Sequence, residues 1–259
     1  CAIGVGCGGG VMEAAKASVQ KLCSQYSVKT TSVLSKISPD VEKARAANKA
    51  RGSRGEVRCG RVWRGQRSEE MPYRDDSVAI FASKGKGQIG NAVSPFNVRV
   101  PEDLTRWATV DGKRSSPPLP APQPLELMWQ AAKVAEGEEW EAYFVRRARI
   151  YAKATPKRRY IERDAGIAGA CFGSPEDGVV QYVPSRVFYC TAYERAVSQL
   201  PEFKFLEGLV DDGFNVLILG PDGHPLELGA EHIDAAYVDP SKPFGHERVL
   251  VAMLRGERP

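Results

Sequence analysis

The spacing of apolar positions predicts two helices near the start of the chain. Small or apolar side chains recur at helical spacing over residues 11–26, at Val11, Ala14, Ala15, Ser18 and Leu22. Ser38-Pro39-Asp40 is typical of a helix cap and first turn, and predicts a second helix over 41–50. Both helices are short and polar. We therefore expect residues 1–56 to form an N-terminal helical and basic extension, followed by a main domain over 57–259.

The main domain shows patterns of both helix and strand. The apolar runs Val78–Phe81 and Val216–Leu219 have the length of strands. Residues 125–134 carry apolar side chains at helical spacing directly after Pro124, which predicts an amphipathic helix. Five prolines between Ser115 and Pro124 predict an extended connector before it. The expected fold is α+β, a predominantly helical single domain with a few short strands.

Length and composition narrow the class of protein. The chain has 259 residues with 42% hydrophobic and 26% charged positions, which is ordinary for a folded soluble domain with one sizeable core. No run approaches 18 apolar residues, so we expect no membrane span.

The cysteines favour free thiols over a metal site. The six cysteines include no Cys-x-x-Cys pair and have no histidine at ligand spacing, so we expect no structural zinc. No other metal and no cofactor is expected. A chain of this size does not need disulfides, which favours a reducing compartment and an intracellular protein of the cytoplasm or an organelle lumen. Cys190 is expected to be buried in a helix. The start at Cys1 indicates a processed chain or a fragment of a longer one.

The net charge of +4 is unevenly distributed. Residues 43–67 contain nine Lys or Arg and one acid, Glu56, which gives +8 there and leaves −4 for the rest. Such a segment favours contact with nucleic acid or an acidic protein. The alternative is a solvated basic linker. A second basic cluster, Lys157-Arg158-Arg159 with Arg146, Arg147 and Arg149, is expected to bind phosphate or to form the wet face of a helix.

One stripe of polar residues follows the predicted helix after Pro124. Glu126, Gln130 and Lys133 stand at i, i+4 and i+7, so a helix through Lys133 places all three on one face. Taken alone, such a stripe is an exposed polar surface.

Its surroundings resemble the NADAR family. That resemblance rests on Gly90-Asn91-x-x-Ser94-Pro95-Phe96, then a variable stretch, then Glu126-x-x-Trp129-Gln130-x-x-Lys133. It extends in order over about residues 90–255, through a helix expected over 195–206 and the helix end, glycine and strand of 209–219. The chain departs from the family where Pro95 replaces an Asn, where Leu127 replaces a His, and where a Trp-Gly pair is absent near Asp222.

The resemblance implies a NADAR-like fold and cleavage of an N-glycosidic bond without a metal. The implied substrate is ADP-ribose conjugates or a phosphorylated ribose that carries a base. A carboxylate near the anomeric carbon stabilises the oxocarbenium-like transition state or activates water, and Glu126 is the candidate. Lys133, the second catalytic candidate, is expected to meet a phosphate or to pair with Glu126.

The remaining candidates are expected to bind substrate. They are Asn91 and Ser94 for sugar hydroxyls, Phe96 as a pocket wall, Gln130 beside Glu126, and Trp129, which stacks on a base or fills the core. His246 and Glu247 open a predicted helix after Gly245, where they form an anion or ribose site, or Glu247 serves as a cap.

Two other functions are alternatives to the hydrolase that the resemblance implies. One is a non-catalytic subunit of a larger assembly, which contacts nucleic acid or an acidic protein through residues 43–67. The other is a plain nucleic-acid-binding module, which is less favoured because that segment offers only Trp63 for base stacking.

Overall fold

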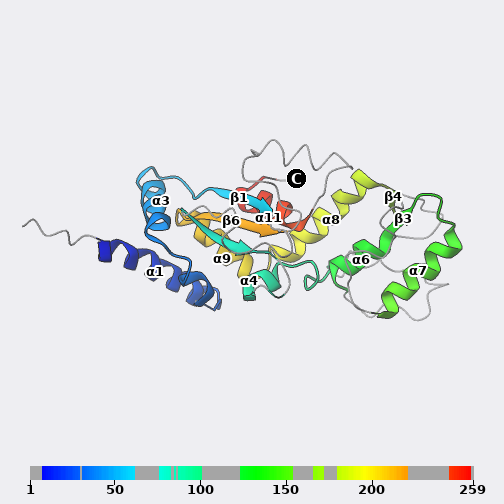
Figure 1. Ribbon diagram of the computed structural model, residues 1–259, viewed down its shortest axis with the longest axis horizontal. Helices are drawn as coiled ribbons and strands as arrows, with labels where there is room; N and C mark the ends of the chain where they lie inside the picture. The colour runs from blue at the N-terminus through cyan, green and yellow to red at the C-terminus, as the bar shows by residue number, and fades with distance from the viewer. Residues whose placement is uncertain are drawn as a thin grey trace, which may run out of the picture. The chain divides into compact units, whose positions relative to one another are not determined.

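A computed structural model describes residues 8–29, 31–61, 76–82, 85, 87–100, 123–153, 166–171, 180–220 and 245–257. These residues mix helices and strands, in agreement with the α+β expectation, and include two three-stranded sheets. They divide into two compact units where the sequence suggested one domain, and Figure 1 shows one sheet in each. We call them the parallel-sheet unit and the antiparallel-sheet unit.

The parallel-sheet unit is built around a buried central strand. Its sheet has the order β1 (Val57–Arg61), β6 (Asn215–Gly220) and β2 (Ser77–Phe81), and both outer strands run parallel to β6. Every residue of β6 after Asn215 is buried. A central parallel strand covered on both faces needs such an unbroken apolar run. The strands predicted over 78–81 and 216–219 are therefore confirmed.

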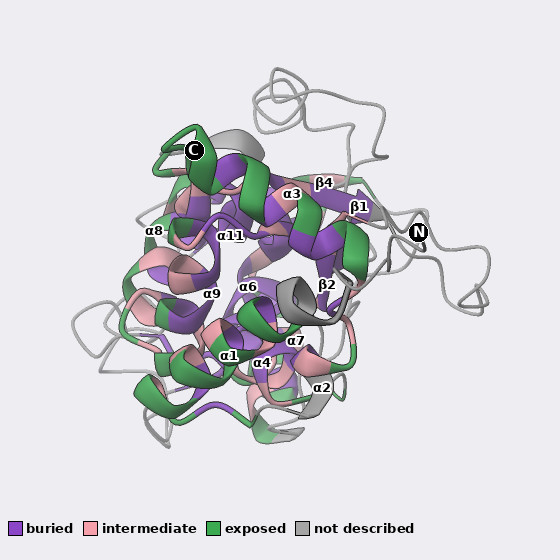
Figure 2. Cartoon of the chain, turned by 90° about the vertical axis from the view of Figure 1, so that its left-hand side faces the viewer, coloured by how far each residue is buried: buried purple, intermediate pink, exposed green. Residues whose placement is uncertain are grey.

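Helices cover this sheet and one another. They are α1 (Gly8–Gln25), α2 (Thr31–Leu34), α3 (Pro39–Ala50), α4 (Gly87–Ala92), α9 (Pro201–Asp211) and α11 (His246–Arg255) from Glu247 on. Helix α3 contacts β2 and β6, α9 contacts β6, and α1 contacts both α3 and α9. Figure 2 shows buried and exposed residues alternating around α3, as a helix packed on one side requires.

The two predicted N-terminal helices are present. Ser38 caps α3 as expected, because its hydroxyl accepts a hydrogen bond from the Val41 amide at 3.2 Å. In α1 the buried stripe is Ala15, Val19 and Cys23, whereas Ala14, which the sequence placed on that stripe, is exposed.

The predicted boundary after residue 56 does not coincide with the division between the units. Helices α1 and α3 lie before it, and β1 follows it, yet all three belong to the parallel-sheet unit. The physical reason is that α3 packs on β6 and α1 packs on α9, so both helices bury apolar side chains against later parts of the chain.

The antiparallel-sheet unit contains the helix that the sequence predicts after Pro124. Its described parts are residues 94–100, α6 (Leu125–Ala132), β3 (Lys133–Ala135), α7 (Trp140–Lys153), β4 (Ile167–Ala170), β5 (Val180–Gln181), α8 (Tyr182–Val197) and His246. The sheet has the order β3-β4-β5, with antiparallel pairing throughout. Helix α6 contacts α7 and α8.

The helix predicted over 195–206 is wrong. Helix α8 ends at Val197, and α9 begins at Pro201 with Leu200 as its N-cap in an extended conformation. Proline lacks an amide hydrogen and disfavours helical geometry at the preceding residue, so Pro201 starts a new helix and cannot continue the old one. The helix end, glycine and strand expected over 209–219 are confirmed, with Gly213 at φ +87° between α9 and β6.

Asp212 joins the end of α9 to α3 and α1. Its carboxylate accepts hydrogen bonds from the Arg45 guanidinium at 2.7 and 3.0 Å, from Lys49 Nζ at 2.6 Å, and from the Ser18 hydroxyl. Partial burial alone would raise the Asp212 pKa, but the hydrogen bonds from Lys49, Ser18 and Arg45 hold it below its usual range.

This carboxylate predicts a loss of stability in acid. A carboxyl group whose pKa is lowered by folding stabilises the protein above its unfolded pKa of about 3.9, and that stabilisation is lost as the pH falls through the lowered folded value. We expect the free energy of unfolding to fall between about pH 5 and pH 2, and to fall less steeply in Asp212→Asn. Urea unfolding at a series of pH values measures both slopes. Equal slopes in the two proteins would contradict the assignment.

None of the helices in the described part of the chain combines the length and apolar character that crossing a membrane requires.

Candidate functional site

The turn at residues 94–98 meets the start of α6 in the antiparallel-sheet unit. The Glu126 amide donates a hydrogen bond to the Pro95 carbonyl at 2.9 Å, and the Leu125 amide donates to the Val98 carbonyl at 2.9 Å. Within the loop, the Val98 amide donates to the Ser94 carbonyl at 2.9 Å. The turn 94–98 therefore satisfies backbone groups in the first turn of α6, which places it next to Glu126.

Helix α6 is buried on all sides. All eight of its residues are buried, including Glu126 and Gln130, each 7% exposed. The Gln130 side-chain amide donates a hydrogen bond to Glu126 Oε1 at 2.9 Å. The interpretation of this stripe as an exposed polar surface is therefore wrong, because the helix lies between α7 and α8. The sequence did predict that Glu126 and Gln130 share a face.

Lys133 does not continue that face. Helix α6 ends at Ala132, and Lys133 is extended, with φ −61° and ψ 133°, as the first residue of β3. There it pairs with Ala170 of β4, so strand pairing ends the helix one residue too early for Lys133 to lie below Gln130. The Lys133 ammonium lies 5.6 Å from the centre of the Trp129 ring. The catalytic role expected for Lys133 stays a prediction.

An aromatic run leads away from α6. The Trp129 ring lies 5.2 Å from Tyr189, Tyr189 lies 6.3 Å from Tyr193, and Tyr193 lies 5.8 Å from the His246 imidazole. Trp129 is 9% exposed, which favours its role in the core. His246 is buried at the start of α11, as the sequence placed it. The run brings two of the predicted binding residues into one connected set of rings.

Cys190 belongs to the same helix as two of these rings. It is buried in α8, as expected, and burial raises the pKa of its thiol well above the usual range. A thiol that resists ionisation is a poor nucleophile, so Cys190 belongs to the core and not to the chemistry.

Ser94 offers a buried hydroxyl in the loop, and Phe96 is half-buried two residues on. Ser94 is 1% exposed, and its Oγ has no hydrogen-bond partner among the described residues. A buried hydroxyl without a partner costs about 1–3 kcal/mol. We expect Ser94→Ala to raise the free energy of unfolding by about 1 kcal/mol, measured by urea unfolding. A loss of stability of similar size would show that the hydroxyl has a protein partner.

Two predicted residues belong to the parallel-sheet unit. The Asn91 side-chain oxygen accepts a hydrogen bond from the Gly85 amide at 2.6 Å and so helps to hold the turn before α4. Glu247 is fully buried in the first turn of α11 and lies against Gly220 at the end of β6. An acidic side chain in a first helical turn suits the capping alternative. Their roles toward a substrate stay predictions.

The basic segment is structured in its described part. It runs through the end of α3 into β1. Arg45 is buried between Glu42 and Asp212, Arg54 pairs with Asp211, and Arg58 pairs with Glu56. The solvated-linker interpretation is therefore wrong here, because these cations pair with carboxylates of the same unit. Contact with nucleic acid or an acidic protein through 43–67 stays a prediction.

The sequence did not predict that one arginine of the second basic cluster is buried in α7. Arg147 is 1% exposed and lies over the rings of Tyr143 and Tyr151, at 5.9 and 5.8 Å, and its Nη1 donates to the Tyr143 hydroxyl at 3.3 Å. Its neighbour Arg146 pairs with Glu138 at 2.7 Å. Burial of Arg147 excludes the wet helix face for this residue, and binding of phosphate by the cluster stays a prediction. The available signal was the i, i+4, i+8 spacing of Tyr143, Arg147 and Tyr151.

Several expectations lie outside the described residues. They concern Trp63, the connector up to residue 122, the basic cluster 157–159 and the region of Asp222. Among the residues that are described, no group of three or more His, Cys, Asp or Glu is placed to hold a metal ion.

In comparisons with known proteins, no family model, no curated protein and no solved structure matches the chain.

Proposed function

We propose that the chain is a divergent NADAR-like hydrolase that cleaves the N-glycosidic bond of an ADP-ribose or ribose-phosphate conjugate. The observation that carries this proposal is the junction of the turn 94–98 with the first turn of α6, where Glu126 is buried and hydrogen-bonded to Gln130. A buried carboxylate held by a neighbouring amide is pre-oriented, and orientation is what a developing positive charge on the sugar requires.

The reaction assigned to this carboxylate is hydrolysis. The bond between the anomeric carbon and the base nitrogen breaks, and its electron pair leaves with the base. Water adds its oxygen to the anomeric carbon and gives up a proton, which Glu126 accepts and which the leaving base finally carries. Glu126 also stabilises the oxocarbenium character of the sugar through its negative charge.

The binding residues are assigned around Glu126. Ser94 donates to a sugar hydroxyl, Phe96 forms a wall, and Trp129 backs the site from the core. His246, and Lys133 through its ammonium, meet the phosphate. Asn91 and Glu247 belong to the parallel-sheet unit and are not assigned to this site.

We place this activity inside the cell. Cys23, Cys59, Cys171 and Cys190 are buried free thiols in the described part of the chain. Free thiols support a reducing compartment, since an oxidising one favours disulfides.

Release of a free base tests the proposal. The full chain is incubated with ADP-ribosylated nucleobases and, separately, with ribosyl-amino pyrimidine phosphates, and the products are separated by chromatography. We expect release of the base together with ADP-ribose from the first class of substrate and with a ribose phosphate from the second. If a folded preparation, verified by circular dichroism, releases no base from either class, the proposal fails.

A further inference from the structure

A polar groove opens in the parallel-sheet unit at the amino ends of its strands. It has a volume of about 560 Å³ and lies between α3 and the starts of β1, β2 and β6. Small-molecule sites have volumes of about 300–1,000 Å³. The proposed hydrolase chemistry uses none of the polar residues that line it, so the groove needs a separate explanation.

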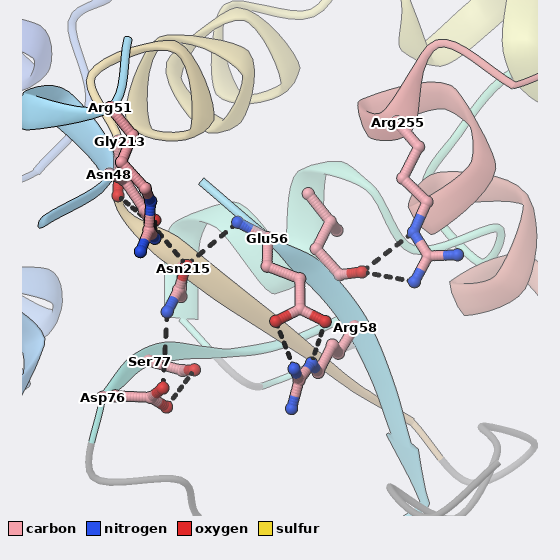
Figure 3. A network of polar contacts seen from close by, with 10 residues as sticks. Asn48, Arg51, Glu56, Arg58, Asp76, Ser77, Gly213, Asn215 and Arg255 are labelled. Carbon is pink, nitrogen blue, oxygen red and sulfur yellow. Dashed lines mark hydrogen bonds and ion pairs between the residues drawn. The ribbon is translucent and has the colours of Figure 1, made fainter. Parts of the chain in front are cut away.

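Two asparagines that line the groove hold its surroundings together through the hydrogen bonds drawn in Figure 3. Asn48 donates to the Gly213 carbonyl at 2.9 Å and to the Asn215 side-chain oxygen at 3.0 Å. The same oxygen accepts from the Glu56 amide at 2.9 Å, and the Asn215 side-chain amide donates to Asp76 at 3.4 Å. These bonds tie α3 and the start of all three strands together. Lining residues fixed in this way lose little conformational freedom when a ligand binds.

Three arginines line the groove, and they are unequally engaged. Arg51 donates to the Asn48 side-chain oxygen at 2.7 Å, and no carboxylate of the described residues pairs with it. Arg54 pairs with Asp211 at 2.7 Å, but their side chains are 49% and 62% exposed, and such surface pairs exchange readily. Arg58 is held by Glu56. A guanidinium offers paired donors that match the oxygens of a phosphate, and Arg51 has its charge available for one.

Two carboxylates line the same groove. Glu56 and Asp76 offset two of the three arginine charges, which leaves a net +1 on the lining. A carboxylate accepts hydrogen bonds from hydroxyl groups and repels further negative charge. The lining therefore suits a ligand with one phosphate and several hydroxyls better than a polyanion.

We propose that this groove binds a small sugar phosphate. Arg51, supported by Arg54, binds its phosphate, and Glu56 and Asp76 accept hydrogen bonds from its hydroxyls. Binding here involves neither Glu126 nor any residue of the antiparallel-sheet unit, and it stands whether or not the chain hydrolyses N-glycosidic bonds.

Calorimetric titration of the full chain with ribose 5-phosphate tests the proposal. Ribose and inorganic phosphate, the two parts of this compound, are titrated separately for comparison. We expect saturable binding of ribose 5-phosphate and at least tenfold weaker binding of either part. Nuclear magnetic resonance locates the site, because the side-chain amide signals of Asn48 and Asn215 should shift during the same titration. Absence of binding at millimolar ribose 5-phosphate, or binding that leaves both amide signals in place, would overturn the proposal.

Variants that each remove one positive charge distinguish binding in the groove from nonspecific attraction of the phosphate to a basic protein. Arg51→Gln is expected to weaken binding by about 10- to 100-fold, because it removes a charge-assisted bond to phosphate. Lys43→Gln is the matched control, since it removes one charge from an exposed position of the same helix. Arg54→Gln, at a half-exposed position, serves if Arg51→Gln does not fold. Equal loss in the control and in the groove variants would overturn the proposal, as would Arg51-dependent binding of a single-stranded RNA without binding of ribose 5-phosphate.

Discussion

Glu126→Gln is expected to lower kcat for base release by about 10²–10⁴-fold, the usual contribution of a positioned general acid or base. Glutamine has the shape of glutamate and keeps an oxygen that accepts the hydrogen bond now made to Glu126 Oε1 by Gln130. The variant therefore keeps the shape of this side chain in α6 and removes its negative charge and its capacity to accept a proton. KM should change little, since the role proposed for the carboxylate is mainly in the transition state.

A second isosteric variant controls for this result. Glu136→Gln removes a carboxylate from an exposed position of the same unit, shortly after β3, and should leave kcat within about twofold. Both variants are compared with wild type by chromatography of the released base and by circular dichroism. If Glu126→Gln retains more than about a tenth of the wild-type kcat, Glu126 is not the catalytic carboxylate.

The elements that the sequence predicted well are those governed by local rules. Ser38 and Pro39 start α3 because a hydroxyl cap and a proline without an amide hydrogen suit a helix start wherever they occur. The run Val216–Leu219 becomes the central strand because an unbroken apolar stretch of that length suits a strand covered on both faces. In both cases the signal lies within a few residues of its consequence.

The conformation of Lys133 could not be predicted from its neighbours in the sequence. Helical spacing placed it below Gln130, but it leaves the helix to pair with Ala170, which lies 37 positions later in the sequence. A three-residue strand carries too little pattern to be recognised, and its pairing partner decides its conformation. The expected three-residue stripe therefore reduces to Glu126 and Gln130.

The interpretation of the basic segment 43–67 as a solvated linker was wrong for a related reason. Its charge suggested a solvated stretch, yet the buried side of α3 contains Val41, Arg45 and Asn48 at i, i+4 and i+7. Arg45 is buried because Asp212 comes close to it in the fold, although 167 positions separate them in the sequence. Without knowledge of that partner, a buried arginine and an exposed one have the same appearance in a sequence.

The junction of β1 with β6 carries the other large expected effect, Gly55→Ala. A β-carbon on Gly55 would overlap the backbone carbonyl of Phe214, directly before β6. Backbone atoms cannot rotate away as a side chain can, so the backbone segments at Gly55 and Phe214 must move apart. That movement opposes the hydrogen bonds from the Gly55 amide to Val210 at 2.7 Å and from the Val216 amide to Glu56 at 2.8 Å.

We expect Gly55→Ala to lower the free energy of unfolding by about 3–5 kcal/mol, from overpacking together with strained or broken backbone hydrogen bonds. Such a loss is a large fraction of the 5–15 kcal/mol by which domains of this kind are usually stable. Urea unfolding followed by circular dichroism measures it, and faster amide hydrogen exchange in β6 locates it in the parallel-sheet unit.

Gly60→Ala supplies the comparison within the same strand. The β-carbon added there would meet Leu219 Cδ2 at 2.7 Å, which is the far end of a flexible side chain that can move aside. Its cost should stay below about 1.5 kcal/mol, partly offset by the lower conformational entropy of the unfolded chain. Equal losses of stability in both variants would show that the added volume alone decides the effect. A loss confined to Gly55→Ala shows that position 55 requires glycine because the backbone of Phe214 approaches it closely.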